Sequence, residues 1–278
     1  MDKPTVGILH PGSMGAAVAA CAATNAAGVL WCTQGRSPAS AARAEQAGLT
    51  PVSTLRELLD RSGILISLCP PAAAEDLARD IAGHTFAGTY VEANAISPER
   101  AQRIAGLLGP AATVVDGAVV GSPPVGGKTP TLYLSGPTAA TTTVETVFDG
   151  TAVRTKVLGT EVGQASALKL SYTAFQKTSR VLAALATGMA RQYDVDQELL
   201  EVAARRSTSY LAEPEYIPKV AARAWRWGPE LEEAAGTLSA AGLPPEMLRA
   251  AASTLARWND AKDGELTLTD ALDRLAQP

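Results

Sequence analysis

The 278-residue sequence predicts an α/β domain with a mainly parallel sheet, then a long connecting helix and an all-helical domain. Short apolar segments alternate with helical segments through the first 160 residues, which is typical of βαβ units. After residue 160 the apolar residues recur at helical spacing instead. We therefore expect two domains, residues 1–160 and residues 161–278.

Six segments of the first domain have the length and apolar character of strands. They are Thr5–His10, Val29–Thr33, Gly63–Leu68, Thr89–Ala93, Thr113–Asp116 and Thr131–Leu134. The third is apolar throughout, as expected of a parallel strand buried on both faces. Helices are expected between the strands, at Ser13–Ala27, Pro38–Ala47, about Ala72–Ala82, and from Ser97-Pro98 onward.

The second domain opens with a proline-free stretch, Glu161 to Arg191, that predicts one long amphipathic helix. Its apolar stripe contains Leu168, Tyr172, Phe175, Leu182, Leu185 and Met189. Such a stripe in a small helical domain needs a partner surface, which favours a homodimer. Further helical segments are expected, broken at Pro214, Pro218, Pro229 and Pro244-Pro245.

Composition excludes several classes of protein. A net charge of −4 and a pI near 5.3 leave no basic face for nucleic acid. No apolar run approaches the roughly 20 residues that span a bilayer, and the N-terminus lacks the apolar stretch of a signal peptide. These features predict a cytoplasmic protein that does not bind membranes.

Metal and thiol chemistry are also disfavoured. The chain has three cysteines without a C-x-x-C pattern and only two histidines, His10 and His84. A disulfide framework, a zinc site and a Ser-His-Asp triad all need more than this. Cys69 precedes two prolines at a strand end, but a catalytic thiol also needs a nearby base or helix end.

A glycine-containing turn joins the first strand to the first helix. Rossmann domains have G-x-G-x-x-G here, with the second glycine admitting the pyrophosphate and the third packing the helix on the strand. Gly12 and Gly15 fill those two places, and Ser13 and Met14 lie between them at a helix N-terminus that favours phosphate. His10 replaces the first glycine. It either contacts the cofactor or is tolerated in a slightly widened turn.

The end of the second strand indicates which nicotinamide cofactor binds. NAD-selective domains place an acidic residue there to accept from the ribose 2′-hydroxyl. Here the segment is WCTQGRS, residues 31–37, with no acid before Glu45. Because a guanidinium pairs well with phosphate, Arg36 and Ser37 favour NADPH over NADH. The other interpretation is that Arg36 is a solvated loop charge.

Several segments together resemble the β-hydroxyacid dehydrogenase superfamily, which includes 6-phosphogluconate dehydrogenase and the imine reductases. Gly12-Ser13-Met14-Gly15, Arg36-Ser37 and Leu68-Cys69-Pro70 are similar to its cofactor-binding segments. Residues 92–98, EANAISP, are similar to its D-x-S-T-x-S-P segment, with Asn94 in the serine place. The resemblance implies that Cys69, Pro70 and Asn94 lie along the cofactor.

The resemblance also implies a substrate loop and a catalytic lysine. Residues 116–122, DGAVVGS, are similar to the family's D-A-P-V-S-G-G, with Val120 in place of its serine and Ser122 able to compensate. Residues 163–173, GQASALKLSYT, keep the family's lysine as Lys169 but change both asparagines, to Tyr172 and Thr173. We therefore expect Gly121 and Ser122 to contact a substrate that differs from the family's usual one.

Lys169 suits the reduction of a carbonyl group. The cofactor supplies hydride to carbon, and an ammonium supplies the proton and stabilises negative charge on oxygen. Tyr172, Thr173 and Gln176 follow Lys169 by three, four and seven residues, so a helix places them on its face as substrate-binding candidates. The alternative is that this strip is merely the solvated side of the helix.

Three functions remain open from the sequence. The favoured one is an NADPH-dependent oxidoreductase for a small carbonyl/alcohol pair, with Lys169 as general acid/base. The alternatives are an imine reductase, whose family members usually lack this lysine, and a nucleotide-binding regulatory protein without catalysis. Four aromatic residues of the second domain either line a substrate pocket or form core: Tyr210, Tyr216, Trp225 and Trp227.

Overall fold

The computed structural model describes residues 3–192, 194–205, 210, 213–240 and 245–276. The chain divides into two compact units, Met1–Lys169 and Leu170–Pro278. The division falls inside one long helix, whereas the sequence analysis placed a boundary before that helix. The roles assigned to the two parts, cofactor binding and substrate binding, stay predictions.

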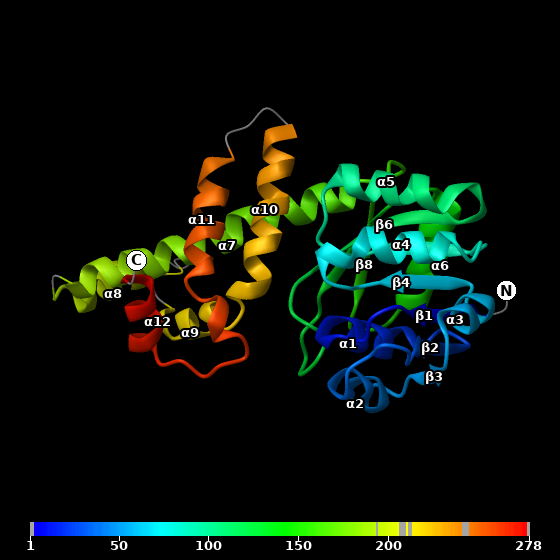
Figure 1. Ribbon diagram of the computed structural model, residues 1–278, viewed down its shortest axis with the longest axis horizontal. Coiled ribbons are helices and arrows are strands. Elements are labelled where there is room, and N and C mark those ends of the chain that lie inside the picture. Colours follow the sequence, from blue (N-terminus) through cyan, green and yellow to red (C-terminus); the bar gives the residue numbers. More distant parts are fainter. Residues whose placement is uncertain (1–2, 193, 206–209, 211–212, 241–244, 277–278) are drawn as a thin grey trace. The chain divides into compact units, whose positions relative to one another are not determined.

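The first unit is built on one eight-stranded sheet (Figure 1). Its strands are β1 (Thr5–Ile8), β2 (Gly28–Cys32), β3 (Thr50–Val52), β4 (Ile64–Ser67), β5 (Thr89–Glu92), β6 (Thr113–Val120), β7 (Thr131–Ser135) and β8 (Arg154–Gly159). The strand order is β3-β2-β1-β4-β5-β6-β7-β8, and only β6 and β7 pair antiparallel. The first six strands have the order of the dinucleotide-binding Rossmann fold, so the expected fold class is confirmed.

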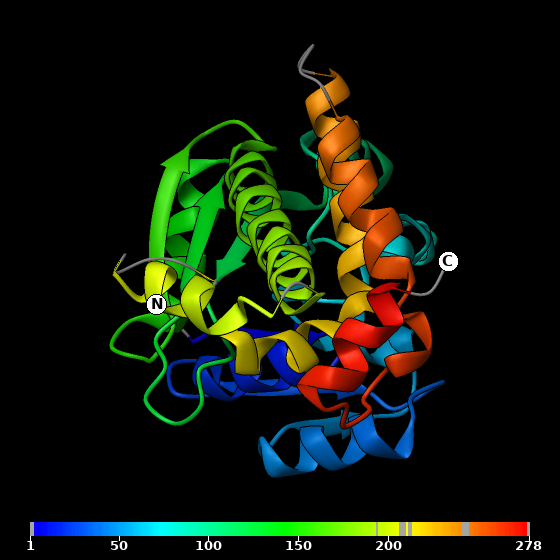
Figure 2. The ribbon, with the colours of Figure 1, turned by 90° about the vertical axis from the view of Figure 1, so that its left-hand side faces the viewer.

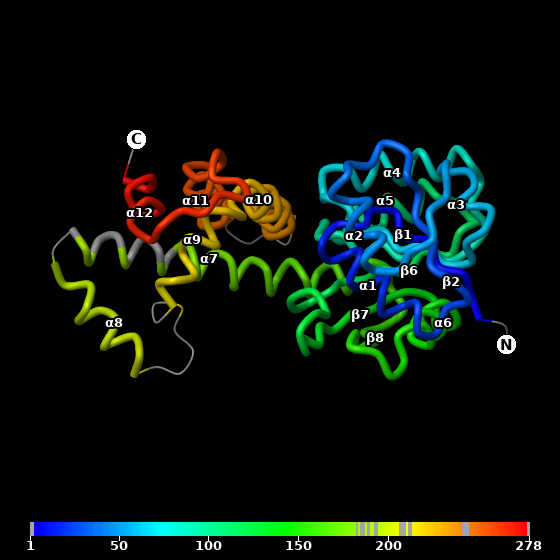
Figure 3. Tube along the Cα trace, turned by 90° about the horizontal axis from the view of Figure 1, so that it is seen from below, coloured from blue at the N-terminus to red at the C-terminus, as the bar shows by residue number. Residues whose placement is uncertain are grey.

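Helices cover both faces of this sheet (Figure 3). One face packs on α1 (Ser13–Ala22), α2 (Pro38–Gln46) and α6 (Thr138–Phe148). The other packs on α3 (Leu55–Arg61), α4 (Ala74–Ala82) and α5 (Pro98–Leu108). Alternate residues of β2 belong to opposite cores, with Trp31 on one side and Leu30 on the other. This alternation explains why the strands are apolar throughout.

Four elements of the first unit were not expected from the sequence. β3 and β8 are edge strands, and β3 is only three residues long with Pro51 at its centre, which a sheet tolerates at its edge. α3 is a short helix capped by Thr54. α6 is rich in threonine, a residue of low helix propensity, so its helical character depends on the buried Val144 and Phe148.

The described residues of the second unit form helices and the segments that connect them, without a strand, as expected. Its helices are the rest of α7 (Gln164–Gln192), then α8 (Asp196–Ala204), α9 (Ile217–Ala221), α10 (Ala224–Ala240), α11 (Glu246–Ala256) and α12 (Leu268–Ala276). α10 and α11 lie side by side (Figure 2). Trp258 is fully buried in their core and donates its indole N–H to the Ala271 carbonyl at 2.8 Å.

Pro229 was expected to break a helix but lies inside α10. The helix continues through it because α10 buries Trp227, Leu231 and Ala234 against its neighbours, which offsets the lost backbone hydrogen bond. Pro218 falls in the first turn of α9, where proline costs little. Pro244 lies outside the described residues.

The long helix α7 forms as expected, but its apolar stripe is not buried where it is described. Leu168, Tyr172 and Phe175 are exposed, Phe175 by 70%, while Leu170 and Val181 are buried instead. The side chains of Leu182, Leu185 and Met189 lie outside what the structure describes. Among the described residues, no helix is long and apolar enough to cross a membrane.

Candidate functional site

The expected cofactor residues gather at one edge of the sheet. β1, β2, β4, β5 and β6 all run in the same direction, so their carboxyl ends meet at this edge. The chain order reverses between β1 and β4, which is where ligands bind in open α/β sheets. Gly12, Arg36, Cys69, Asn94 and Gly121 each follow one of these strand ends.

The turn after β1 has the close packing that a dinucleotide site requires. A Cβ on Gly15 would lie 2.2 Å from the His10 carbonyl oxygen, so only glycine lets α1 approach β1 this closely. Gly12 is the N-cap of α1 and makes no side-chain cap hydrogen bond. Ser13 is exposed and Met14 is half-buried against the core. The N–H groups in the first turn of α1 therefore have no capping side chain from Gly12, and they form the positive end of the helix dipole.

Two arginines from the β2–α2 region contact this turn. Arg36 donates from Nη1 to His10 Nδ1 at 2.9 Å and from Nη2 to the Leu9 carbonyl at 2.7 Å. Arg43, on α2, donates from Nε to the Pro11 carbonyl at 3.2 Å. Arg36 Nε is buried without a hydrogen-bond partner among the described residues. Arg36 is therefore not a solvated loop charge, because its guanidinium is held against the β1–α1 turn.

Ser37 begins α2. Its hydroxyl accepts from the Ser40 N–H at 3.3 Å and donates to the Ser40 hydroxyl at 3.2 Å. Ser37 remains exposed beside Arg36, so the two residues expected to hold a 2′-phosphate are adjacent in space as well as in sequence. The two hydrogen bonds between Ser37 and Ser40 were not expected from the sequence.

Asn94 joins the ends of β4 and β5. Its Oδ1 accepts from the Cys69 N–H at 2.6 Å, and its Nδ2 donates to the Ser67 hydroxyl at 2.9 Å. Its own N–H donates to Glu92 Oε1 at 3.0 Å. Asn94 is buried, so what its side chain does in this structure is hold the Leu68-Cys69-Pro70 segment in place. Direct contact with a cofactor stays a prediction.

Two buried groups beneath this segment have shifted pKa values. Burial raises the pKa of Glu92 to about 7, although hydrogen bonds from Asn94 and Tyr90 act in the opposite sense. Burial, together with the nearby Glu92 carboxylate, raises the pKa of the Cys69 thiol to about 11. A thiol with so high a pKa is protonated at neutral pH, which supports the sequence argument against a catalytic Cys69.

The expected substrate loop is mostly strand. β6 continues to Val120, four residues beyond the expected end at Asp116, because Asp116 to Val120 pair with β7. Only Gly121 and Ser122 are outside the strand, and both are exposed at its carboxyl end. Gly121 has a φ of +123°, which a residue with a side chain rarely adopts.

Asp116 has a role that the sequence did not reveal: it anchors the start of α7. Its Oδ2 accepts from the N–H groups of Gly163 and Ser166 at 2.9 Å, and its Oδ1 accepts from the Ser166 hydroxyl at 2.6 Å. The Ser135 hydroxyl donates to it as well, at 3.2 Å. The partners lie up to 50 residues apart, so no local pattern could have indicated them.

Lys169 lies one turn further along α7. Its Nζ donates to the Val119 carbonyl at 2.8 Å, which holds the ammonium beside the carboxyl end of β6. That end belongs to the same sheet edge as the Gly12–Gly15 turn. The Lys169 ammonium and the glycine turn at the start of α1 therefore occur along one edge of one compact unit.

Tyr172, Thr173 and Gln176 follow Lys169 in α7 and belong to the second unit. Tyr172 is exposed, Gln176 is half-buried and Thr173 is buried. They follow Lys169 by three, four and seven residues along α7. A contact of these three residues with substrate stays a prediction.

The four aromatic residues that the sequence singled out in the second unit contact charged side chains or pack in the core. Trp227 is buried and lies 5.3 Å from Lys177 Nζ, which also forms a salt bridge with Glu230. Tyr210 and Tyr216 stack on Arg180, at 4.2 and 3.7 Å from the guanidinium carbon. Trp225 is partly exposed and contacts Lys262. These contacts favour the core interpretation for Trp227.

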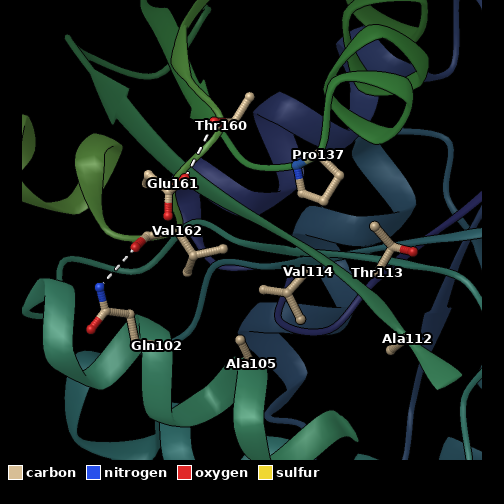
Figure 4. Close-up of a pocket in the computed structure, with 9 residues that line it drawn as sticks. All are labelled: Gln102, Ala105, Ala112, Thr113, Val114, Pro137, Thr160, Glu161 and Val162. Carbon is tan, nitrogen blue, oxygen red and sulfur yellow. Dashed lines mark hydrogen bonds between the residues drawn. The ribbon is translucent and has the colours of Figure 1, made fainter. Parts of the chain in front are cut away.

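A separate hollow of about 570 Å³ lies away from the expected site (Figure 4). Its lining comes from α5, the amino end of β6 and the segment before α7, with Gln102 donating to the Val162 carbonyl at 3.1 Å. None of the expected site residues lines it. In the described part of the chain, no group of His, Cys, Asp and Glu side chains could hold a metal ion.

Sequence comparisons identify relatives without a stated activity. A family model described as a domain of unknown function, DUF1932, matches residues 190–258, which is less than half of the chain. The "Uncharacterized 28.5 kDa protein in 7S RNA 5′ region" of Methanothermus fervidus is 28% identical over 174 residues. That alignment covers 63% of this chain and 66% of the relative, just under two thirds of its length.

Solved structures with the same fold include characterised enzymes. A 3-hydroxyisobutyrate dehydrogenase of Mycobacterium tuberculosis, solved with L-serine, has a TM-score of 0.77 at 18% identity, with 100% of both chains covered. A reductive aminase of Aspergillus terreus, solved with NADPH and ethyl-5-oxohexanoate, has a TM-score of 0.60 at 20% identity, covering 98% of this chain and 99% of that one.

Identities this low establish the fold alone. The chain therefore has the fold of the 3-hydroxyacid dehydrogenases and imine reductases, and the resemblance expected from its sequence motifs is confirmed at that level.

Proposed function

We propose that the protein is a nicotinamide-dependent oxidoreductase that prefers NADPH and acts on a small carbonyl/alcohol pair. One observation carries the proposal: Lys169 Nζ is held on the Val119 carbonyl, at the sheet edge that also presents the Gly12–Gly15 turn. The proposal thus combines a proton donor with a phosphate-binding turn at one strand-end crevice.

The turn fits a dinucleotide on three counts. Gly15 lets α1 pack closely on β1, Gly12 leaves the α1 N-terminus without a side-chain cap, and Arg36 carries an unsatisfied buried Nε beside it. The pyrophosphate would bind at Gly12, Ser13 and Met14, and the Leu68-Cys69-Pro70 segment would lie along the nicotinamide half. When bound, the nicotinamide would supply or accept the hydride.

The preference for NADPH is supported by charge at the end of β2. Arg36 and Arg43 bring two guanidinium groups to this end, with the Ser37 hydroxyl beside them. Between the end of β2 and Glu45 there is no carboxylate to accept from a ribose 2′-hydroxyl. A 2′-phosphate would therefore meet two cations and a hydroxyl.

Cofactor binding tests this part of the proposal. We expect wild-type protein to bind NADPH more tightly than NADH in a fluorescence titration, and Arg36→Ala to remove most of that difference. Loss of one charge-assisted contact weakens NADPH binding roughly 10- to 100-fold. Arg56→Ala is the control, because Arg56 pairs with Asp60 on exposed α3. A wild-type preference for NADH would contradict the NADPH assignment.

Lys169 supports the catalytic part. Reduction of a carbonyl leaves negative charge on oxygen, and an ammonium beside that oxygen stabilises the charge and donates the proton. In the oxidative direction the neutral amine accepts the alcohol proton. The Val119 carbonyl restricts the ammonium to one position, so less freedom is lost when substrate binds.

Turnover tests this assignment and separates the alternatives. We expect NADPH oxidation with small ketones or keto acids, and Lys169→Ala to lower turnover roughly 10²- to 10⁴-fold while cofactor affinity changes little. Lys156→Ala, at an exposed lysine of β8, is the control. Activity with cyclic imines alone would indicate an imine reductase. Cofactor binding without turnover of any substrate would indicate a regulatory protein.

A further inference from the structure

His10 occupies the place of the first glycine of the nucleotide-binding pattern, and the proposed function does not use it. Its ring is half-buried between the β1–α1 turn and Arg36. Arg36 Nη1 lies 2.9 Å from His10 Nδ1, and Arg36 Nη2 is fixed by the Leu9 carbonyl. The imidazole is therefore held in one orientation by a guanidinium that is itself held by the backbone.

This contact determines which ring nitrogen of His10 carries the proton. A guanidinium only donates hydrogen bonds and stays charged in proteins, so Nδ1 must be the acceptor. His10 is then neutral, with its proton on Nε2. Its Nε2–H is a donor directed away from Arg36.

The ring edge that carries Nε2 faces Gly12. A Cβ built on Gly12 would lie 3.4 Å from His10 Cδ2 and 3.9 Å from His10 Nε2. The space left by the missing side chain of Gly12 is the space that a Rossmann turn opens to the pyrophosphate. From this geometry we infer that His10 binds the cofactor pyrophosphate through Nε2–H, with Arg36 as the positioning residue that fixes the tautomer.

The charges around His10 give this contact a pH dependence. The charged side chains that act on the ring are Arg36 and Arg43, and the first turn of α1 contains no acidic residue. Burial and these two guanidiniums lower the pKa of His10 below 6.5. A bound pyrophosphate offsets the positive charge and raises this pKa. Binding therefore takes up a proton, and affinity increases as pH falls through the interval between the two pKa values.

Imidazole nitrogen NMR tests the tautomer and the contact. The chain contains only two histidines, so a ¹⁵N-labelled sample gives two ring systems, and His84→Gln assigns them. We expect His10 at pH 8 to have a protonated Nε2 and an unprotonated Nδ1. Adding NADP⁺ should shift His10 Nε2 and raise the His10 pKa, while His84 stays unchanged. A proton on Nδ1, or no response of His10 to bound NADP⁺, would overturn the inference.

Two substitutions of His10 show whether it binds the pyrophosphate directly or only holds the Arg36 side chain in position. The amide of His10→Gln reaches the position of Nε2 and can donate there, whereas the amide of His10→Asn reaches only Nδ1 and can accept from Arg36. We expect His10→Asn to weaken NADPH and NADH alike, by roughly five- to tenfold, and His10→Gln to stay closer to wild type. The reverse order would mean that His10 only positions Arg36.

The inference rests on the proposed cofactor site, and the two can fail separately. If wild-type protein binds neither dinucleotide, the proposed function fails and the phosphate contact fails with it. If wild-type protein binds a dinucleotide but His10→Asn binds both as tightly, only the role of His10 is wrong. Repeating the NADH titration between pH 5.5 and 8 adds a second check, because the pH dependence should disappear in His10→Gln.

Discussion

Glu92, at the end of β5, has a fully buried carboxyl group. The Tyr90 hydroxyl donates to its Oε2 at 3.3 Å and the Asn94 N–H to its Oε1 at 3.0 Å. Two hydrogen bonds do not replace the water that a carboxylate loses, so burial raises its pKa to about 7. Glu92 therefore ionises near neutral pH, directly beneath the segment held by Asn94.

This shift predicts a pH-dependent stability. Between pH 4.5 and 7 the folded protein keeps a proton on Glu92 that the unfolded chain releases, so the free energy of unfolding falls as pH rises. The slope reaches about 1.4 kcal/mol per pH unit. We expect Glu92→Gln, which cannot ionise, to unfold with a flatter pH dependence and to gain most over wild type at pH 8. Thermal unfolding from pH 4.5 to 8 measures this.

Exposed Glu99→Gln on α5 is the matched control and should leave the pH profile unchanged. Parallel wild-type and Glu92→Gln curves would show that Glu92 does not titrate in this range.

At the scale of elements, the start of α7 decides where Lys169 lies. The Asp116 carboxylate on β6 accepts from two backbone N–H groups, that of Gly163 just before α7 and that of Ser166 in its first turn. It thereby caps α7 from another element, with 47 and 50 residues between donor and acceptor. Burial raises the pKa of Asp116 while these hydrogen bonds oppose the rise. The cap and the Lys169–Val119 contact together join α7 to β6.

Asp116→Asn should loosen this junction. Its amide NH₂ cannot accept, so buried donors at the start of α7 lose their partner, at a cost on the order of 2–4 kcal/mol in unfolding free energy. Urea unfolding measures the loss, and turnover should fall more than cofactor affinity because Lys169 is displaced. Ser135→Ala, which removes the hydrogen bond to Asp116 and the one that the Ser135 hydroxyl accepts from the Ala165 N–H, should cost less, about 1–2 kcal/mol. Equal stability of Asp116→Asn and wild type would contradict the capping role.

Element by element, the sequence predicted the segments with a clear apolar pattern and missed those without one. The strands β1, β2, β4, β5, β6 and β7 were predicted from their short, mostly apolar segments. The edge strands β3 and β8 and the threonine-rich α6 were not, since their formation depends on neighbours that lie far away in the chain. The continuation of β6 to Val120 was missed for the same reason, because β7 pairs with it.

At the scale of the whole molecule, the order of elements predicted the class of fold. Alternating strands and helices imply parallel βαβ units, and the first six strands are indeed parallel, although their order in the sheet was not predicted. The antiparallel β7 was not predictable in orientation, because strand composition does not encode direction. The expected homodimer and the expected cytoplasmic location both stay predictions.

In the candidate site, the motif residues were predictable from the sequence and their hydrogen-bond partners were not. Gly12, Gly15 and Lys169 were recognisable from their motifs, and at Gly15 the structure leaves no room for a side chain. The hydrogen-bond partners of the site residues were not recognisable from the sequence. Arg36 pairs with a residue 26 positions away and Lys169 with one 50 positions away.

The sequence by itself thus determined the parallel α/β sheet, the long helix and the glycine turn, because each follows from local periodicity or local backbone geometry. Only the tertiary structure decided that Arg36 fixes the tautomer of His10 and that Asp116 holds α7. These contacts join residues on different elements. Residues that meet only in the folded structure have no fixed separation along the chain, so no sequence pattern reveals them.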